Sequence, residues 1–336
     1  DGWDNVNYID RIFGTGFTQK HNITVQGGSE KSKYFASFGY LGQKGNIDNF
    51  SYKRYNARVN IGAQFSKNLR FEMGLAGQIG DKRQPGLEAG GSWSSAVGEA
   101  AIPWYSIAEQ TIFAHPYLPT EIDGVYVGSL NRHDYAYNPL AAIYESGEFK
   151  NQVTSLQSNV SLTWNLPWVQ GLSLKVSGAY DTSISESKNL STPYYLMAEV
   201  KPTVLSADAK AYKGLQLDPR GNDKINLQEG LYKTSQLVGQ FSLNFERQFD
   251  KHDVKALALM EIRDNKVNNF GAYGTGLDFV ELPELSNTKP NTQMANPIYG
   301  SSDHTRSAGL VVRLNYAYDN RYLVELAARY DGSYKF

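Results

Sequence analysis

The five histidines are the side chains in this sequence best suited to bind a metal or to move a proton at neutral pH. They are widely separated along the chain, at His21, His115, His133, His252 and His304. None belongs to a His-Glu-x-x-His motif, and there is no cysteine to complete a thiolate zinc site. A Gly-x-Ser-x-Gly nucleophile elbow is also absent. The sequence therefore predicts no catalytic residue, no metal site and no cofactor, and we expect that the protein is not an enzyme.

Two other arrangements that resemble chemical motifs have simpler interpretations. Gly74, Gly77 and Gly80 have a regular spacing, but no helix is predicted to follow them, so a dinucleotide-binding turn is not indicated. Glu121 and Asp123 lie in a predicted loop without a neighbouring base, and we interpret them as solvated. The 33 Lys and Arg residues balance 34 Asp and Glu residues, which argues against nucleic acid as a partner.

Aromatic residues crowd a long segment in the first half of the chain. Such rings stack on the C–H faces of sugars and also on peptide side chains. The candidate ligand-binding residues are Trp93, Trp104, Tyr105 and Tyr117. An alternative is that the rings hold this segment together or attach it to a partner protein. The same segment predicts a short helical stretch at Ser94–Ala101, which Pro103 would end.

The strongest pattern in the sequence has a period of two. From Tyr55 to Ser66 the odd positions are apolar or aromatic, and the even positions carry no large apolar side chain. The pattern restarts at Leu69, directly after Lys67 and Asn68. Only an extended strand places alternate side chains on opposite faces, so these two segments predict an antiparallel hairpin.

Eight further segments follow a similar pattern, which brings the total to about ten strands. They are 18–27, 33–43, 153–166, 172–181, 235–249, 253–263, 306–319 and 321–331. Short turns join the strands within each successive pair, whereas most connections between pairs are long, at about 82–150, 182–234 and 264–305. Short turns at one end and long loops at the other are typical of outer-membrane barrels. The predicted fold is an all-β antiparallel transmembrane β-barrel.

In such a barrel, the apolar face of each strand contacts lipid and the other face borders a wet lumen. The predicted lipid-facing residues are Val59, Ile61, Phe71, Leu75, Leu243, Val312, Leu314 and Leu326. The other face carries charges, among them Arg58, Arg70, Glu72, Arg313 and Glu325. Aromatic pairs beside the short turns, such as Phe65 with Phe71 and Trp164 with Trp168, predict an interfacial girdle.

The strands of a large soluble sandwich or propeller would also alternate between apolar and polar residues. Three features argue against these folds: strands of 10–14 residues, the systematic difference between short and long connections, and charged residues on the polar face. No run of apolar residues is long enough to form a transmembrane helix.

Two stretches of the sequence resemble a known family. GGSEKSKYFASFGYLGQKG, followed by KRYNARVN at Lys53–Asn60, is similar to the start of the barrel in SusC-like TonB-dependent transporters (the SusC/RagA family). RLNYAYDNRYLVELAARYDGSYKF at Arg313–Phe336 resembles a later hairpin of that family, and Asn138-Pro139-Leu140 is also familiar there. The resemblance reaches both ends of the chain, although the loops match poorly.

The resemblance implies a 22-stranded barrel with a plug, of which residues 1–336 would form one arc of a single barrel domain, with the plug absent from this chain. It also implies long extracellular loops, a SusD-like surface lipoprotein as a lid, and a TonB complex that acts through the plug. The expected location is the outer membrane of a Gram-negative, Bacteroidota-type cell, with multiple crossings among the outer-membrane lipids. The expected function is active import of a glycan, an oligosaccharide or a peptide.

Leu257 and Leu259 depart from the pattern, because they share a face with Lys255, Glu261 and Arg263. We expect them to contact the plug; the alternative is a local bulge that turns them toward lipid. For the whole protein, the alternatives are a passive outer-membrane porin and a soluble surface β-protein that binds or cleaves glycans.

Overall fold

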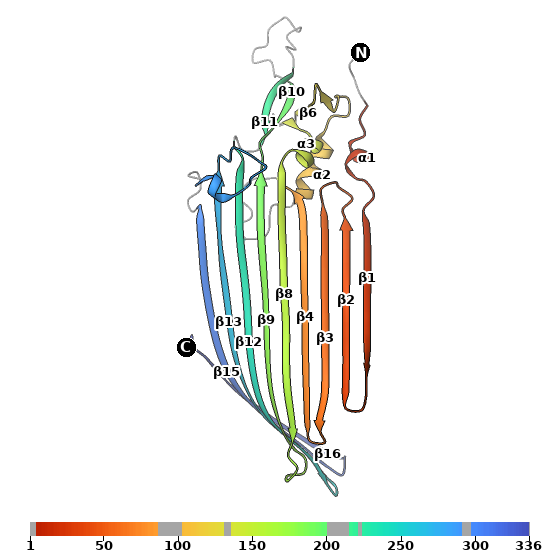
Figure 1. Ribbon diagram of the computed structural model, residues 1–336, viewed down its shortest axis with the longest axis vertical. Helices are drawn as coiled ribbons and strands as arrows, with labels where there is room; N and C mark the ends of the chain where they lie inside the picture. Colours follow the sequence, from red (N-terminus) through yellow and green to blue (C-terminus); the bar gives the residue numbers. More distant parts are fainter. Residues whose placement is uncertain are drawn as a thin grey trace, which may run out of the picture.

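The computed structural model describes residues 5–86, 103–130, 136–199, 215–220, 224–290 and 297–335. One long sheet dominates it, and every pair of neighbouring strands in this sheet is antiparallel (Figure 1). Its main strands, in spatial as well as chain order, are β1 (Phe17–Gly28), β2 (Ser32–Lys44), β3 (Ser51–Ser66), β4 (Leu69–Pro85), β8 (Gly147–Asn165), β9 (Leu172–Ser191), β12 (Asn226–Phe249), β13 (His252–Thr275), β15 (Ile298–Tyr318) and β16 (Tyr322–Ser333). The predicted all-β antiparallel fold with about ten long strands is confirmed.

Short turns join the strands pairwise at the lower end of the sheet in Figure 1. Asp250 has a φ of 49°, and Asp319 and Asn320 have φ values of 52° and 53°. Aspartate and asparagine tolerate this left-handed backbone because their short polar side chains bond to the nearby main chain. Gly171 has a φ of 88° in the β8–β9 turn. The local sequence therefore suits the turns that set the register of these hairpins.

At the opposite end, several strands continue beyond their predicted boundaries. β9 runs to Ser191, β12 begins at Asn226 and β13 runs to Thr275. The connections are therefore shorter than the predicted loops at 182–234 and 264–305. Parts of these extensions are polar on both faces, as in the stretch Ser185–Asn189, so the alternation in hydropathy is lost there. The ladder continues because main-chain hydrogen bonds do not require an apolar face.

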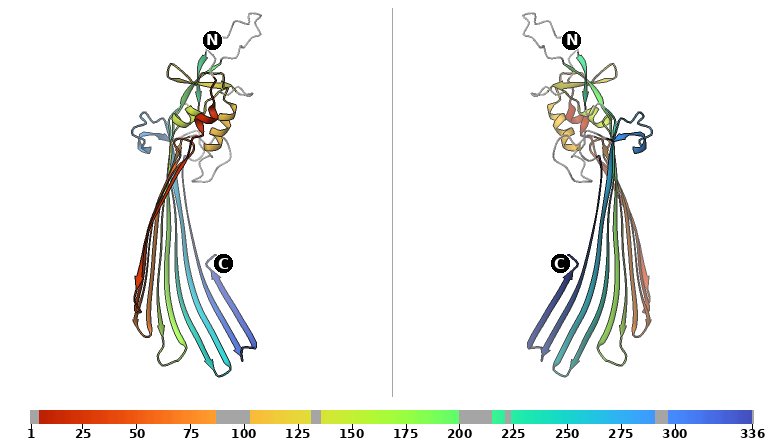
Figure 2. Two further views of the ribbon diagram at one scale, coloured as in Figure 1. Left: turned by 90° about the vertical axis from the view of Figure 1, so that its right-hand side faces the viewer. Right: turned by 90° about the vertical axis from the view of Figure 1, so that its left-hand side faces the viewer.

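Helices and a second, five-stranded sheet gather at this same end (Figures 1 and 2). We call this region the cap. Its elements are α1 (Tyr8–Ile12), α2 (Pro103–Phe113), α3 (Pro139–Tyr144), β5 (Glu121–Ile122), β6 (Val125–Leu130), β7 (Ala136–Tyr137), β10 (Tyr194–Glu199) and β11 (Leu215–Arg220). Two short elements, η1 (Leu285–Asn287) and β14 (Lys289–Pro290), lie between β13 and β15 in the chain, and β14 pairs with β13.

The cap has a small hydrophobic core of its own. Ile12 of α1, Ile107 of α2 and Ile143 of α3 are buried together with Ile47 from the β2–β3 turn and Ala142. Burial of apolar surface contributes about 25 cal/mol per Å², so these contacts hold segments that are distant in sequence against the end of the sheet.

Helix α2 begins at Pro103, which corrects the prediction that this proline ends a helix. Proline fits the first turn because the N–H that it lacks would have no partner inside the helix. The stretch predicted to be helical, Ser94–Ala101, lies outside the described residues.

β1 and β16 are the two edges of the main sheet as the structure describes it. Each has one neighbour, so one side of its backbone has no partner strand among the described residues. This matches the prediction of an arc rather than a closed barrel of ten strands.

Candidate functional site

The strand registers of the main sheet define its two faces, and the register shift between Gln64 and Ser66 in the β3–β4 ladder lies next to the short turn. Val59 lies opposite both Ala36 and Leu75, and Leu243 lies opposite both Leu174 and Ala258. Residues that are directly opposite in neighbouring strands point to the same side. All eight residues that we predicted to face lipid therefore share one side of the sheet, which we call the apolar face.

The apolar face is not covered by another layer in the part of the chain that the structure describes. Six of the eight predicted residues are between 38% and 61% exposed, and Val59 and Phe71 are half-buried by their neighbours in the sheet. A packed sandwich would have buried these side chains in a dry core. The soluble-sandwich alternative therefore disagrees with the structure, while contact of these residues with lipid stays a prediction.

Aromatic pairs lie beside the short turns. The rings of Phe65 and Phe71 stack with their centroids 5.8 Å apart, and those of Trp164 and Trp168 meet edge to face at 5.4 Å. Tyr322 lies opposite Tyr318 in the β15–β16 ladder. Trp168 remains 70% exposed, so this end of the sheet presents large amphipathic rings to its surroundings.

The other side of the sheet, which we call the polar face, carries amides, hydroxyls and charges. Among them, Glu261 accepts hydrogen bonds from Gln240 at 2.6 Å and from Arg263 at 3.0 Å. Most of these groups are only partly buried, which suits a wet surface better than a packed interior. The arrangement can bind polar groups by hydrogen bonds and charge.

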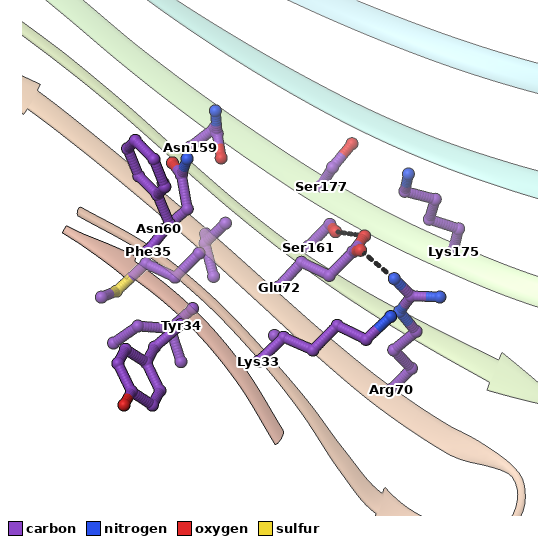
Figure 3. Close-up of a pocket in the computed structure, with 15 residues that line it drawn as sticks. Lys33, Tyr34, Phe35, Asn60, Arg70, Glu72, Asn159, Ser161, Lys175 and Ser177 are labelled. Carbon is purple, nitrogen blue, oxygen red and sulfur yellow. Dashed lines mark hydrogen bonds and ion pairs between the residues drawn. The ribbon is translucent and has the colours of Figure 1, made fainter. Parts of the chain in front are cut away.

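A hollow of about 520 Å³ lies on the polar face near the short turns (Figure 3). Gly62 contributes no side chain to it, and Lys33 and Lys175 line it from strands on either side. Glu72 accepts a hydrogen bond of 2.6 Å from Arg70 and one of 3.5 Å from Ser161 (Figure 3). Three cations thus surround one carboxylate, and this hollow was not anticipated from the sequence.

Leu257 and Leu259 lie on the polar face, as the sequence pattern indicated. Leu257 is opposite Asn244 and Arg313, and Leu259 is opposite Ser242 and Val311. No register shift interrupts these ladders, so the alternative of a bulge that turns the leucines to the apolar face is wrong. Their contact with a plug stays a prediction.

The cap holds three of the four predicted ligand-binding residues. Trp104 and Tyr105 are neighbours in the first turn of α2, with ring centroids 6.1 Å apart, and are 54% and 61% exposed. Tyr117 lies beyond the end of α2, where its ring stacks on His115 and its hydroxyl is 2.9 Å from Nδ1 of that histidine. Trp93 lies outside the described residues. α2 thus presents an exposed aromatic pair while Ile107, on its other side, is buried.

Asn138 supports the cap from within and is fully buried. Its Oδ1 accepts hydrogen bonds from the main-chain nitrogens of Leu140 and Ala141, which caps α3. Its Nδ2 donates to the main-chain oxygens of Val127 at 2.9 Å and Thr120 at 3.3 Å. Sequence reasoning noted the Asn-Pro pair only as a resemblance, although asparagine before proline is a recognised helix start.

A hydrogen bond of 2.7 Å joins Tyr144 of α3 to Asp48 of the β2–β3 turn. This bond, together with burial, raises the pKa of Tyr144 to about 12. The same bond and the neighbouring Lys44 lower the pKa of Asp48. Burial and the charge of Glu121 raise the pKa of Glu145, next to Tyr144. The pKa shifts of Tyr144 and Asp48 make the attachment of the cap to the sheet sensitive to pH.

Within the described ranges, no group of three or more His, Cys, Asp or Glu side chains is placed to hold a metal ion. None of the helices described is both long and apolar enough to cross a membrane.

No family model matches the chain. Among curated proteins, TonB-dependent receptor P3 of Formosa agariphila is 23% identical over 337 residues, which cover 99% of this chain and 30% of that protein. TonB-dependent receptor SusC of Bacteroides thetaiotaomicron is 23% identical over 350 residues, which cover 100% of this chain and 31% of SusC. The chain therefore spans about a third of the length of these relatives.

Among solved structures, the RagAB peptide importer in its closed-closed state matches with a TM-score of 0.72 and 20% identity. The match covers all of this chain and 34% of the importer chain. The importer in its open-open state matches with the same TM-score. Over its whole length, the chain is similar in sequence to TonB-dependent receptors of the SusC type, and it shares the fold of part of the importer chain.

Proposed function

We propose that this chain forms part of the wall of an outer-membrane transporter that imports a large nutrient, a glycan, an oligosaccharide or a peptide, with energy from TonB. The observation that carries the proposal is the division of the sheet into an exposed apolar face and a polar face along its antiparallel ladders. A membrane wall with a hydrated lumen requires this division. The curated relatives, named as TonB-dependent receptors, support the use of TonB.

In this proposal, the short turns lie in the periplasm and the cap lies outside the cell, as in other outer-membrane barrels. Residues 1–336 then belong to one barrel domain. Further strands of a longer protein pair with β1 and β16, because an unpaired strand edge in lipid is very costly. The much greater length of the relatives supports this part of the proposal. A plug inside the complete barrel would meet the polar face, including Leu257 and Leu259.

The proposed surface partner is a SusD-like lipoprotein that covers the cap. The exposed pair Trp104 and Tyr105 lies on the first turn of α2, where it contacts either the imported nutrient or this lid. The peptide importer among the solved structures favours a peptide, and the family resemblance of the sequence implies a glycan as the other class. We keep both classes as proposed substrates.

The test uses the full-length protein in a Bacteroidota host. Membranes are first washed with carbonate and then extracted with detergent, and uptake of labelled oligosaccharides and oligopeptides is compared with and without TonB. We expect the protein only in the detergent extract, and uptake of one substrate class only when TonB is present. Uptake that persists without TonB would indicate a passive porin. Release by carbonate alone would indicate a soluble surface protein.

A further inference from the structure

On three adjacent strands the continuous apolar rows give way to a mixture of charged and apolar side chains. On β12, β13 and β15 the last continuous apolar rows are Phe241–Met260–Leu310 and Gly239–Ile262–Ala308. Beyond these rows, on the same face and toward the cap, charged side chains stand among single apolar ones such as Leu237 and Phe270. We call this group the basic patch; it consists of Lys233, Asp264, Lys266, His304 and Arg306.

The registers bring the basic patch together. Arg306 lies directly opposite Asp264, and His304 lies directly opposite Lys266. Nε of Arg306 donates a hydrogen bond of 2.8 Å to Oδ2 of Asp264, and Nε2 of His304 lies 2.9 Å from both carboxylate oxygens. Asp264 therefore holds two of the basic side chains in place at the centre of the patch.

The charges of the basic patch do not cancel. The group holds three cations, Lys233, Lys266 and Arg306, and one carboxylate, that of Asp264, which leaves an excess of two positive charges even without a charge on His304. Within the described chain, neither Lys233 nor Lys266 has a carboxylate within ion-pair distance, whereas Arg306 is paired with Asp264. Lys266 is exposed and Arg306 is 64% exposed, so both remain accessible to a ligand.

The same face of β4 and β8 provides a contrast. There, Lys150 forms an ion pair of 2.7 Å with Glu148, and Arg83 pairs with both Glu148 and Asp81. The two cations are balanced by two carboxylates. The excess of positive charge on β12, β13 and β15 is therefore a local property and not a general feature of this end of the sheet.

The position of the basic patch matches a membrane interface. The ten steps from Phe249, near the short turns, to Gly239 correspond to about 34 Å of strand, or about 26 Å across the membrane for a tilt of about 40°. The apolar band of outer-membrane barrels is about 25 Å tall. Asp264 and Arg306 stand one row beyond this distance, at the depth where lipid headgroups begin.

We infer that the basic patch binds the phosphate of a lipid headgroup in the leaflet on the cap side of the membrane. A phosphate offers several acceptor oxygens, and it fits a surface that presents the Arg306 guanidinium and two lysine side chains next to an apolar surface that would hold acyl chains. This inference rests on the membrane orientation in the proposed function, and it adds a specific lipid contact to that orientation.

The test uses the full-length protein, extracted from the outer membrane with detergent and exchanged into a non-ionic detergent. Binding of phosphatidic acid, phosphatidylcholine and inorganic phosphate is measured by native mass spectrometry. Variants are Lys266→Gln and the double variant Lys233→Gln/Lys266→Gln. The matched control is Lys150→Gln, which removes a cation from the same face where Glu148 already neutralises it.

We expect phosphatidic acid to bind more tightly than phosphatidylcholine. Its dissociation constant should rise about fivefold for Lys266→Gln and about 25-fold for the double variant, and should stay unchanged for Lys150→Gln. The inference would be overturned if Lys150→Gln lost as much affinity for phosphatidic acid as the other variants, or if the double variant lost none. Inorganic phosphate that binds as tightly as phosphatidic acid would assign the patch to a free anion instead. This assay uses protein that detergent has already extracted from the membrane. A failure to bind lipid would therefore overturn the lipid site without overturning the membrane location, which the carbonate wash tests separately.

Discussion

The side-chain nitrogen of Asn138 donates a hydrogen bond of 2.9 Å to the main-chain oxygen of Val127, and this contact joins the start of α3 to strand β6 inside the cap. The amide oxygen of the same side chain caps α3. One fully buried residue thus satisfies main-chain groups of two elements, neither of which belongs to the main sheet.

Replacement of Asn138 tests this role. Asn138→Ala removes the cap and leaves buried main-chain groups without partners, so we expect a loss of about 2–4 kcal/mol in cap stability. Asn138→Asp keeps the capping oxygen but places an acceptor against the oxygens of Val127 and Thr120, so it should also destabilise. Hydrogen exchange of the Leu140 and Ala141 amides reports on the cap alone. Protection equal to that of the wild type in both variants would contradict the assignment.

The membrane orientation of the apolar face predicts a large effect at Val59. Val59→Arg places a charge near the middle of this face and should lower the free energy of unfolding in lipid by roughly 2–4 kcal/mol. Gln78→Arg, on the polar face of the neighbouring strand, is the control and should change it little. Urea unfolding of the full-length protein in lipid vesicles measures both. Similar values for the two variants would mean that Val59 does not face lipid.

Residues 257 and 258 of β13 point to opposite faces, and the absence of native cysteine allows clean labelling in this chain. Leu257→Cys with a photoreactive maleimide should cross-link to polypeptide inside the barrel of the full-length protein, whereas Ala258→Cys should cross-link to lipid. Mass spectrometry of the products distinguishes the two. Lipid adducts at residue 257 would exclude its proposed contact with a plug.

The aromatic pair on α2 predicts a loss of binding without a loss of folding. Trp104→Ala with Tyr105→Ala should weaken ligand or lid binding by about tenfold, because the contact of an aromatic pair contributes about 0.5–1.5 kcal/mol beyond the area it buries. Ile107→Ala, in the buried core of the cap, is the counterpart and should cost about 2–5 kcal/mol of stability. Calorimetric titration with substrate and with the lid measures binding. Unchanged affinity for both in a folded double variant would exclude Trp104 and Tyr105.

The Tyr144–Asp48 bond predicts how cap stability depends on pH. The pKa of Asp48 is lower in the folded cap than its unfolded value of 3.8. The contribution of Asp48 to cap stability is therefore present above pH 3.8 and is lost as the pH falls through the lower, folded pKa. The pKa of Tyr144 is raised from its unfolded value of 10.0 to about 12 in the folded cap. The contribution of Tyr144 to cap stability is therefore present below pH 10.0 and is lost as the pH rises through about 12.

Tyr144→Phe isolates this bond. The difference in cap stability between wild type and Tyr144→Phe should be constant between about pH 5 and pH 9 and should shrink at both extremes. The intrinsic rate of hydrogen exchange itself changes with pH. Cap stability is therefore measured by tryptophan fluorescence during urea unfolding at each pH. A difference that does not change down to pH 2 would show that Asp48 is not the partner.

Local sequence determined the strands, their two faces and the hairpin turns of this protein. The reason is that alternation with a period of two records which face each side chain must occupy, and Asp250, Asp319 and Asn320 suit their turns without help from distant residues. The same local pattern placed all eight apolar residues on one face and Leu257 and Leu259 on the other.

Only the tertiary structure decided how far the strands extend and how the cap is built. Where β9, β12 and β13 extend toward the cap, apolar residues such as Leu231 and Phe270 no longer recur with a regular period of two, so hydropathy carries little signal there, although the main-chain ladders continue. The burial of Asn138 and Ile107, and the clustering of Lys266 with Arg306, depend on contacts between segments distant in the chain. Such contacts arise from packing and register, which no short stretch of sequence encodes by itself.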